Sequence, residues 1–190
     1  MSTGRPLDTL AVTGRPTAAR RAFAIGAAAL VVAASAQVTV PVPLSPVPMT
    51  LQPLAVLAVG GLLGAKAGGA ALLLYLALGM LGLPVFAGGG AGFIHVLGPT
   101  GGYLLAFPAA AAVAGLFAGA APRLGRVLLG CALAMAVIHA GGTAQLALLG
   151  GDPAPALRVG FIPFLTGDLL KIGIAAAMIL GLGPKLRALL

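Results

Sequence analysis

The chain is short of the residues that keep a protein soluble. Among its 190 residues there is no glutamate and no tryptophan, only three residues are acidic, and charged residues make up 7%. Soluble globular domains carry about 25% charged residues. This deficit, together with 60% hydrophobic residues and a mean hydropathy of +1.13, excludes an ordinary soluble fold. The sequence therefore predicts a polytopic membrane protein.

Motifs typical of enzymes and nucleotide-binding proteins are also missing. The glycine-rich stretch at 84–102 lacks both the dinucleotide fingerprint spacing and the Gly-Lys-Ser/Thr ending of a phosphate loop. No two carboxylates are placed to converge, no Cys/His cluster has metal-ligand spacing, and the single cysteine, Cys131, excludes an internal disulfide. We therefore predict that the protein is not an enzyme and that it holds no metal and no cofactor.

The basic residues exceed the acidic ones and give a formal charge of +8. In a soluble protein this excess would raise the question of nucleic acid. Here the basic residues sit in short loops and tails, where they meet anionic lipid headgroups, so we predict lipid contact and no nucleic-acid partner. If the N-terminus is cytoplasmic, only Arg158 falls outside, and the positive-inside rule predicts that both termini are cytoplasmic. The nine basic residues on the cytoplasmic side are then Arg5, Arg15, Arg20, Arg21, Lys66, Arg123, Arg126, Lys185 and Arg187.

The apolar runs predict an all-α polytopic membrane protein with six transmembrane helices. The first run is too long for the core of a signal peptide, which usually has about 7 to 15 residues, and further runs follow it. We therefore predict a basic cytoplasmic tail at 1–21 and a six-helix transmembrane domain at 22–190. The six runs cover residues 22–39, 51–64, 67–83, 103–120, 127–150 and 161–182.

Two segments on the predicted outer side are rich in residues that bend the backbone. Residues 40–48 carry four prolines and no charge, so we expect an irregular segment folded against the mouth of the bundle. The apolar run that follows is short, which brings the amide of Gln52 either near a cavity or to the headgroup level. Residues 84–102 include three consecutive glycines, and we expect there the backbone freedom of a lid.

The last apolar run contains the only two charges that we place inside the membrane, Asp168 and Lys171. A charged side chain near the middle of a membrane helix costs at least about 2.5 kcal/mol, so such residues normally face the bundle interior, pair or hold a ligand. Asp168 lies about 10 Å from the outer end of the run, and Lys171 about 5 Å deeper. We predict that they form the polar floor of an outward-opening small-molecule pocket. The alternative is an i, i+3 pair that serves only the scaffold.

Two further pairs have more than one interpretation. His139 and Thr143 share a face of the fifth predicted span, where they either line the pocket or, as is more common for such a histidine, meet a neighbouring helix. Ala24 and Ala28 form a small-xxx-small pair in the first span, which would leave a smooth face for close packing. Such pairs also arise by chance in a chain this rich in alanine.

Four motifs, in order and at matching spacing, together resemble the BioY family of biotin transporters, the substrate-binding S components of energy-coupling-factor transporters. The resemblance covers nearly the whole chain after the basic tail. The motifs are the proline segment with Met-Thr-Leu-Gln at 49–52, Gly-Leu-Pro-Val-Phe-Ala-Gly-Gly at 82–89, Gly-Pro-Thr-Gly-Gly-Tyr at 98–103, and Pro-Phe-Leu-x-Gly-Asp-Leu-x-Lys at 163–171.

This resemblance implies a six-helix S-component bundle, high-affinity biotin binding in an outward pocket, and uptake across a prokaryotic cytoplasmic membrane. It also implies a partner module of a transmembrane coupling protein and two ATPase subunits. In such components, small residues at every fourth position of the first helix meet the coupling protein, which assigns Ala24 and Ala28 to partner docking. Biotin is then the transported ligand rather than a cofactor.

The chemistry of biotin suits a mostly apolar pocket with a few polar groups. We assign Asp168 to accept from the ureido N–H groups and Lys171 to attract the carboxylate or donate elsewhere, so which end of biotin each contacts stays open. Gln52, Phe86 and Phe164 are further candidate substrate-binding residues, although ordinary bundle packing is an alternative for the two phenylalanines.

Other functions predict different behaviour. The nearest alternative is an S component for another vitamin such as riboflavin or thiamine, but 5% aromatic residues argue against a ligand held mainly by flat-ring stacking. An ion channel predicts conductance, and a structural membrane protein predicts no ligand. The sequence leaves open whether copies of the chain form a homo-oligomer.

Overall fold

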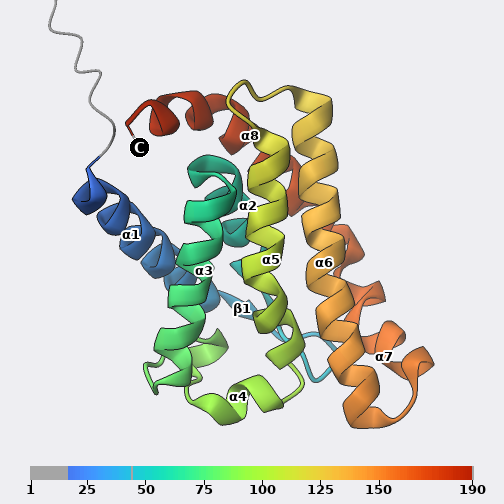
Figure 1. Ribbon diagram of the computed structural model, residues 1–190. Helices are drawn as coiled ribbons and strands as arrows, with labels where there is room; N and C mark the ends of the chain where they lie inside the picture. The colour runs from blue at the N-terminus through green and yellow to red at the C-terminus, as the bar shows by residue number, and fades with distance from the viewer. Residues whose placement is uncertain (1–16, 44, 190) are drawn as a thin grey trace, which may run out of the picture.

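Helices make up most of the protein in the computed structural model, which describes residues 17–43 and 45–189. Two short strands, β1 (Thr39–Val40) and β2 (Met49–Thr50), pair antiparallel within this part of the chain. The helices are arranged as a bundle, with the shortest ones at its lower end (Figure 1). In chain order they are α1 (Ala18–Ala36), α2 (Gln52–Leu63), α3 (Ala65–Met80), the 3-10 helix η1 (Ala87–Gly89), α4 (Phe93–Leu97), α5 (Gly101–Ala118), α6 (Leu124–Gly150), α7 (Pro153–Gly160), the 3-10 helix η2 (Ile162–Phe164) and α8 (Leu165–Leu189).

The first helix begins before the apolar run that predicted it. Thr17 is its N-cap, and the Thr17 hydroxyl accepts a hydrogen bond from the backbone N–H of Arg20 at 3.4 Å. Arg20 and Arg21 therefore lie in the first turn of α1. Residues 1–16 of the predicted basic tail, with Arg5 and Arg15, lie outside the described residues.

The proline-containing connection between α1 and α2 is tied to the other end of the chain. Ser45 lies just before a bend at 46–47 and accepts a hydrogen bond from the backbone N–H of Val47 at 3.1 Å. The same hydroxyl donates to the carbonyl of Val159 on α7 at 2.7 Å. Proline has no N–H to donate, so the prolines of this segment cannot donate the backbone hydrogen bonds that hold a helix or sheet together. The Ser45 side chain supplies hydrogen bonds that hold the segment in their place.

A single residue joins α2 to α3. Gly64 adopts φ 83° there, a left-handed value that favours glycine because a Cβ would be strained. The two helices then approach closely, since a Cβ added to Gly68 on α3 would strike the backbone of Gly60 on α2. Glycine at these two positions therefore lets α2 and α3 pack with their backbones in contact.

The glycine-rich connection between α3 and α5 holds short helical turns, η1 and α4, and one end of it is anchored. The side-chain amide of Gln145 on α6 donates to the carbonyl of Val96 at 2.9 Å and to that of Gly98 at 2.6 Å. Both N–H groups of this amide are thereby used. The segment predicted as a lid is thus fastened to α6 at its C-terminal end.

α5 and α6 lie side by side through the middle of the bundle (Figure 1). A Cβ on Gly102 would strike the carbonyl of Gly141, and the ring of Tyr103 occupies the space that a side chain at Gly142 would fill. The core along α5 and α6 includes the small buried side chains of Ala110, Ala111 and Ala134, beside the larger one of Ile138.

Four helical segments are long and apolar enough to cross a membrane among the described residues: Ala18–Ala36, Gly101–Ala118, Leu124–Gly150 and Pro153–Arg187. The predicted all-helical, multi-pass membrane protein is therefore confirmed. α2 and α3 are apolar but have 12 and 16 residues, which span only about 18 and 24 Å of a hydrocarbon core about 30 Å thick. The count of six spans accordingly stays a prediction.

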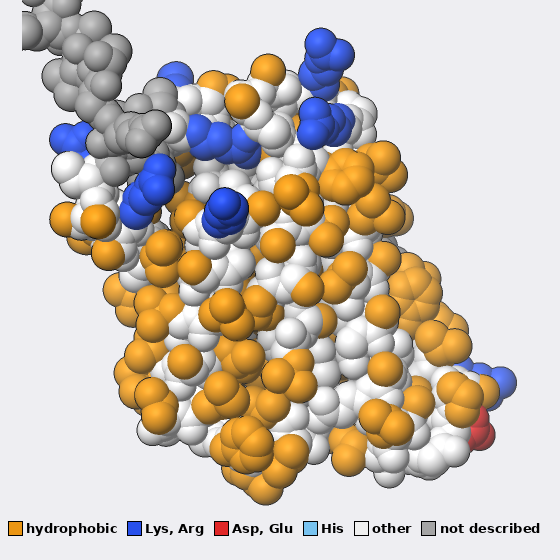
Figure 2. Space-filling view, in the orientation of Figure 1, with side chains coloured by type: hydrophobic (Ala, Val, Ile, Leu, Met, Phe, Trp, Pro, Cys, Tyr) orange, Lys and Arg blue, Asp and Glu red, His pale blue; other side chains and the backbone are white. Residues whose placement is uncertain are grey.

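Basic side chains gather at the upper end of the molecule, where α5 connects to α6 and α8 ends (Figure 2). Two of them also cap helices. Arg126 donates to the carbonyl of Leu116 near the C-terminus of α5 at 3.2 Å, and Arg187 donates through Nε to that of Leu62 on α2 at 3.2 Å. Cations are favourable at helix C-termini because the last carbonyls carry partial negative charge.

Candidate ligand-binding site

A narrow cavity of about 50 Å³ lies in the half of the bundle opposite the basic end, between four helices and the segments that join them. Its walls are mostly apolar, and its polar groups come from α2, α5, α6 and α8, with Thr50 of β2 and the N-cap of α5, Thr100. Every substrate-binding residue predicted from the sequence lies on its wall. The lining residues are Val47, Pro48, Thr50, Gln52, Pro53, Phe86, Ala87, Thr100, Tyr103, Leu104, Phe107, Ile138, His139, Phe164, Asp168 and Lys171.

Asp168 is the centre of a buried charged cluster. Its Oδ1 lies 3.1 Å from Nζ of Lys171, one turn further along α8. Its Oδ2 lies 2.6 Å from Nε2 of His139, which projects from α6. All three residues are less than 10% exposed, so the surrounding protein shields the cluster from solvent. Each carboxylate oxygen therefore has a cationic or N–H partner within the protein.

The second nitrogen of His139 also faces an acceptor. Nδ1 lies 3.3 Å from the carbonyl oxygen of Gly160, at the end of α7, and the Tyr103 hydroxyl donates to the same oxygen at 2.6 Å. A Cβ on Gly160 would run into the Tyr103 hydroxyl at 2.6 Å, so glycine is needed where these groups meet. The imidazole is thus held from both sides, by α7 and by α8.

Aromatic rings surround His139 and complete its burial. The Phe161 ring lies 5.0 Å away at 77°, the Phe164 ring 6.0 Å away at 50°, and the Tyr103 ring 6.1 Å away at 85°, measured between centroids. Edge-to-face and tilted arrangements of this kind are favourable for aromatic pairs. Phe164 thereby both lines the cavity and packs against the histidine.

Gln52 is bound within the protein by a chain of polar contacts. Its Nε2 donates to the hydroxyl of Tyr75 at 2.6 Å, and that hydroxyl donates to the carbonyl of Val85 at 3.2 Å. Its Oε1 accepts from the Thr50 hydroxyl at 3.3 Å. The amide therefore lies beside the cavity, which is one of the two positions expected for it, the other being the headgroup level. Its contacts also connect α2 and α3 to the glycine-rich segment.

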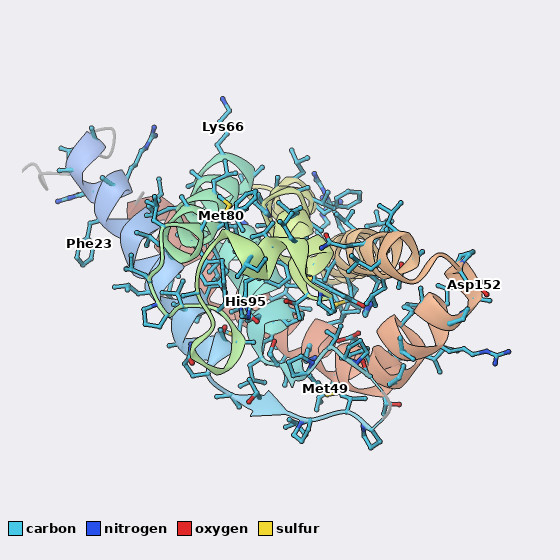
Figure 3. The ribbon with its side chains drawn as sticks, turned by 90° about the horizontal axis from the view of Figure 1, so that it is seen from below. Phe23, Met49, Lys66, Met80, His95 and Asp152 are labelled. Atoms are coloured by element: carbon cyan, nitrogen blue, oxygen red, sulfur yellow. The ribbon has the colours of Figure 1, made fainter. Side chains whose placement is uncertain are left out.

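Phe86 is fully buried between α3 and the glycine-rich segment. Its ring meets Tyr75 edge-on at 5.6 Å and stacks on His95 at 5.8 Å. Figure 3, which views the bundle from the end that carries α4, has His95 near the centre. A Cβ on Gly79 would strike the Phe86 ring, so glycine at this position of α3 leaves the space that the ring occupies. Phe86 therefore does two things: it packs the bundle and forms part of the cavity wall.

Ala24 and Ala28 lie elsewhere, in a large apolar groove bounded by α1, α2 and α8. The groove measures about 1040 Å³, with Leu54, Ala58 and Met178 among its walls. Ala24 is half-buried and Ala28 is 7% exposed. The structure thus separates the predicted docking residues from the predicted ligand residues.

The contact between His139 and Asp168 is the main feature that the sequence left unassigned. The sequence offered two roles for His139, lining the pocket and meeting a neighbouring helix, and in the structure it does both. Tyr103 was visible only as the last residue of the motif at 98–103. No helical spacing relates these contacts, since His139 meets Asp168 across 29 positions of sequence and Tyr103 meets Gly160 across 57.

These features together define a class, a multi-pass helical membrane protein that encloses a small polar site in an apolar bundle. Within that class the chain belongs to the BioY family, whose model matches residues 8–188. The resemblance carried by the four motifs is therefore confirmed.

Relatives and a solved structure agree with this assignment. The probable biotin transporter BioY of Pyrococcus horikoshii is 41% identical over 134 residues, which are 70% of this chain and 79% of that protein. The biotin transporter BioY of Thermotoga maritima is 40% identical over 141 residues, which are 74% and 83% of the two chains. These names describe transport rather than catalysis, in agreement with the prediction that the chain is not an enzyme.

The fold is shared with a crystal structure described as the S-component for biotin from an ECF-type ABC transporter. The two agree with a TM-score of 0.81 over 91% of this chain and 99% of the other, at 24% sequence identity. At that identity the likeness establishes the fold.

Proposed function

We propose that this chain binds biotin and takes it up across a prokaryotic cytoplasmic membrane as the substrate-capture component of an energy-coupling-factor transporter. The observation that carries the proposal is the buried cluster of Asp168, Lys171 and His139 on the wall of a cavity, in a chain of the BioY family. A cluster that served only the scaffold could be replaced by apolar residues at little cost, or with a gain in stability.

The hydrogen-bond donors and acceptors that the cluster does not use internally indicate how biotin would bind. Lys171 has three N–H donors, of which one is directed at Asp168, so two remain for the carboxylate or another acceptor of the ligand. Asp168 accepts one contact on each oxygen and keeps lone pairs for the ureido N–H groups. Gln52, Phe86 and Phe164 would then surround the apolar ring and chain. The contacts of these five residues with biotin are a proposal.

The cavity is narrow compared with ligand pockets of about 300–1,000 Å³. Biotin would therefore enter only as wall segments move apart. The proline-containing segment contributes Val47 and Pro48 to the wall, the glycine-rich segment contributes Phe86 and Ala87, and neither segment is a long helix. We propose that they open toward the outside of the cell.

The membrane placement that we propose has six spans, with α2 and α3 crossing as the two short ones and both termini cytoplasmic. The clustering of basic residues at one end supports this orientation under the positive-inside rule. A short apolar helix can cross the membrane if non-helical residues at its ends complete the span. Such residues are tolerated at membrane depth where surrounding protein shields their backbone from lipid.

We further propose that a transmembrane coupling protein docks in the groove at Ala24 and Ala28 and that two ATPase subunits supply the energy. Small side chains on α1 let another helix approach closely. Membrane lipid would contact the apolar faces of the other helices. The chain would need no cofactor of its own.

The test is to identify the ligand and then to measure its binding. Mass spectrometry of small molecules released from the detergent-purified chain should find biotin, and titration of ligand-free protein should give one saturable biotin site with no response to riboflavin or thiamine. Retention of riboflavin or thiamine, without any response to biotin, would establish the alternative vitamin. Robust ATP hydrolysis by the isolated chain would contradict the need for partner ATPases.

A further inference from the structure

We propose that His139 is a proton-binding positioning residue of this site, so that capture of an anionic ligand takes up a proton. In its protonated form His139 neutralises Asp168 and leaves the charge of Lys171 to the carboxylate of the ligand. The inference rests on the proposed function, because it requires a ligand that carries a carboxylate, as biotin does.

The hydrogen-bonding geometry of the imidazole supports the protonated form. Nε2 lies 2.6 Å from a carboxylate oxygen of Asp168, and Nδ1 lies 3.3 Å from the carbonyl oxygen of Gly160. Both partners are acceptors, since a carbonyl has no proton to give and an ionised carboxylate has none either. A neutral imidazole donates through one nitrogen only and leaves the other facing an acceptor. The imidazolium form donates through both.

The charge balance of the cluster leads to the same conclusion. With His139 neutral, Asp168 and Lys171 cancel, and a bound carboxylate would leave one net negative charge inside the bundle. With His139 protonated, the cluster carries one net positive charge, which the ligand carboxylate cancels. An uncompensated charge in a low-dielectric interior is costly, so the bound state favours the protonated histidine.

The charged and titratable groups that face His139 come from the helices packed against it. From α8, Asp168 and Lys171 face the cluster, and from α5 the Tyr103 hydroxyl shares the Gly160 carbonyl. On α7 the side chains of Asp152, the N-cap, and Arg158 are exposed, and the Asp152 carboxylate accepts from the backbone N–H of Ala154. Among side chains, histidine ordinarily changes charge between pH 5 and 8.

Linkage fixes the sign of the pH effect. Because the ligand-bound site holds the proton more firmly than the free site, raising the pH removes the proton from the free site first, and binding must then bring it back. Biotin affinity should be constant at the acidic end, where the free site is already protonated. It should then fall toward the alkaline side, by up to about tenfold per pH unit for one proton.

The chain offers a matched control because it has only two histidines. His95, on α4, stacks on Phe86 of the cavity wall, and among the described residues it makes no hydrogen bond or ion pair with the charged cluster. His139→Gln keeps a side chain that can donate to Asp168 and removes the proton site. His95→Gln removes the other histidine and leaves the cluster intact.

The decisive experiment is isothermal titration of biotin into detergent-purified protein from pH 6 to 9, in buffers of different ionisation enthalpy. The dependence of the observed heat on the buffer gives the number of protons taken up. We expect uptake that rises from near zero toward one proton per biotin with pH in the wild type and in His95→Gln, and a flat profile near zero in His139→Gln.

A second measurement needs no substitution at the site. Protein labelled with ¹⁵N only at histidine should show both ring nitrogens of His139 protonated when biotin is bound, at a pH where the free protein shows one protonated. Absence of proton uptake across the range, or uptake unchanged in His139→Gln, would overturn the role of His139 while leaving biotin binding intact. Absence of any biotin response would instead refute the proposed function.

Discussion

Removing one member of the Asp168–Lys171 pair should harm the site in two separate ways: it leaves a buried charge without its partner and it removes a ligand contact. Removing both members repairs only the first. We therefore expect Lys171→Ala, Asp168→Asn and the double variant Asp168→Asn/Lys171→Met each to lose at least about tenfold in biotin affinity, about 1.4 kcal/mol.

The measurement is a biotin titration on protein that elutes as a folded species. Lys66→Met is the matched control, because Lys66 is an exposed lysine in the first turn of α3 and should bind as the wild type does. If the double variant also bound with near wild-type affinity, the pair would belong to the scaffold alone.

The Tyr75 hydroxyl links Gln52 to the carbonyl of Val85, and its removal should destabilise the fold. In Tyr75→Phe the buried amide and the carbonyl both lose a partner, which costs about 1 to 3 kcal/mol for each group left unsatisfied. Thermal stability in detergent, followed by the loss of the monodisperse peak after heating, should therefore decrease.

Adding Gln52→Leu to Tyr75→Phe removes the orphaned amide, so part of the lost stability should return. A strictly additive loss in the double variant would show that the two side chains act independently.

At the level of single residues, the sequence predicted the cavity wall better than the contacts within it. Asp168, Lys171 and Gln52 stood out because polar side chains in apolar runs need a reason to be there. The partner of Asp168 on α6 did not stand out, because no helical spacing relates residues on different helices. Only the fold brings His139 and Asp168 within 2.6 Å.

At the scale of helices, the groove-facing part of α1 lies apart from the ligand site, which α1 meets through its C-cap, Gln37, at the carbonyl of Phe86. The two regions should be separable by mutation. Bulky residues at Ala24 and Ala28 would project into the groove between α1, α2 and α8 and block the close approach of another helix. We expect Ala24→Leu/Ala28→Leu to keep biotin affinity but to lose the stimulation of uptake that co-expressed coupling protein and ATPases provide.

Ala22→Leu serves as the control, since Ala22 is an exposed alanine of α1 that does not line the groove. Undiminished stimulation in the groove variant would remove the docking role from Ala24 and Ala28 without affecting the proposed ligand site.

Helix positions were predictable from the apolar runs, whereas helix ends were not. α1 begins at Ala18, ahead of the run at Ala22, because Thr17 caps it. α8 continues to Leu189 through Pro184, beyond the predicted end at Leu182, and Arg187 near its end caps α2. The short helices η1, α4 and α7 have too few residues for apolar periodicity to reveal them.

At the scale of the whole molecule, the asymmetry of basic residues predicts which surface faces the cell exterior. In a Cys131→Ala background, single cysteines at Ala91 and Ala154 should react with an impermeant maleimide on intact cells, whereas one at Ala121 should react only after the cells are opened. Cys131 is the single cysteine of the chain, so its replacement leaves the introduced cysteine as the one thiol that can react. Labelling at position 121 alone would reverse the orientation.

The contact between Tyr103 and α6 has a consequence for how the family diversifies. The Tyr103 ring fills the space beside Gly142, and its hydroxyl lies where a side chain at Gly160 would stand. Positions 103, 142 and 160 are therefore coupled in evolution. A lineage that gains a side chain at 142 or 160 must first, or at the same time, exchange the tyrosine for a smaller residue. Across descendants of a common ancestor, a side chain at 142 or 160 should therefore occur only where position 103 holds a residue smaller than tyrosine.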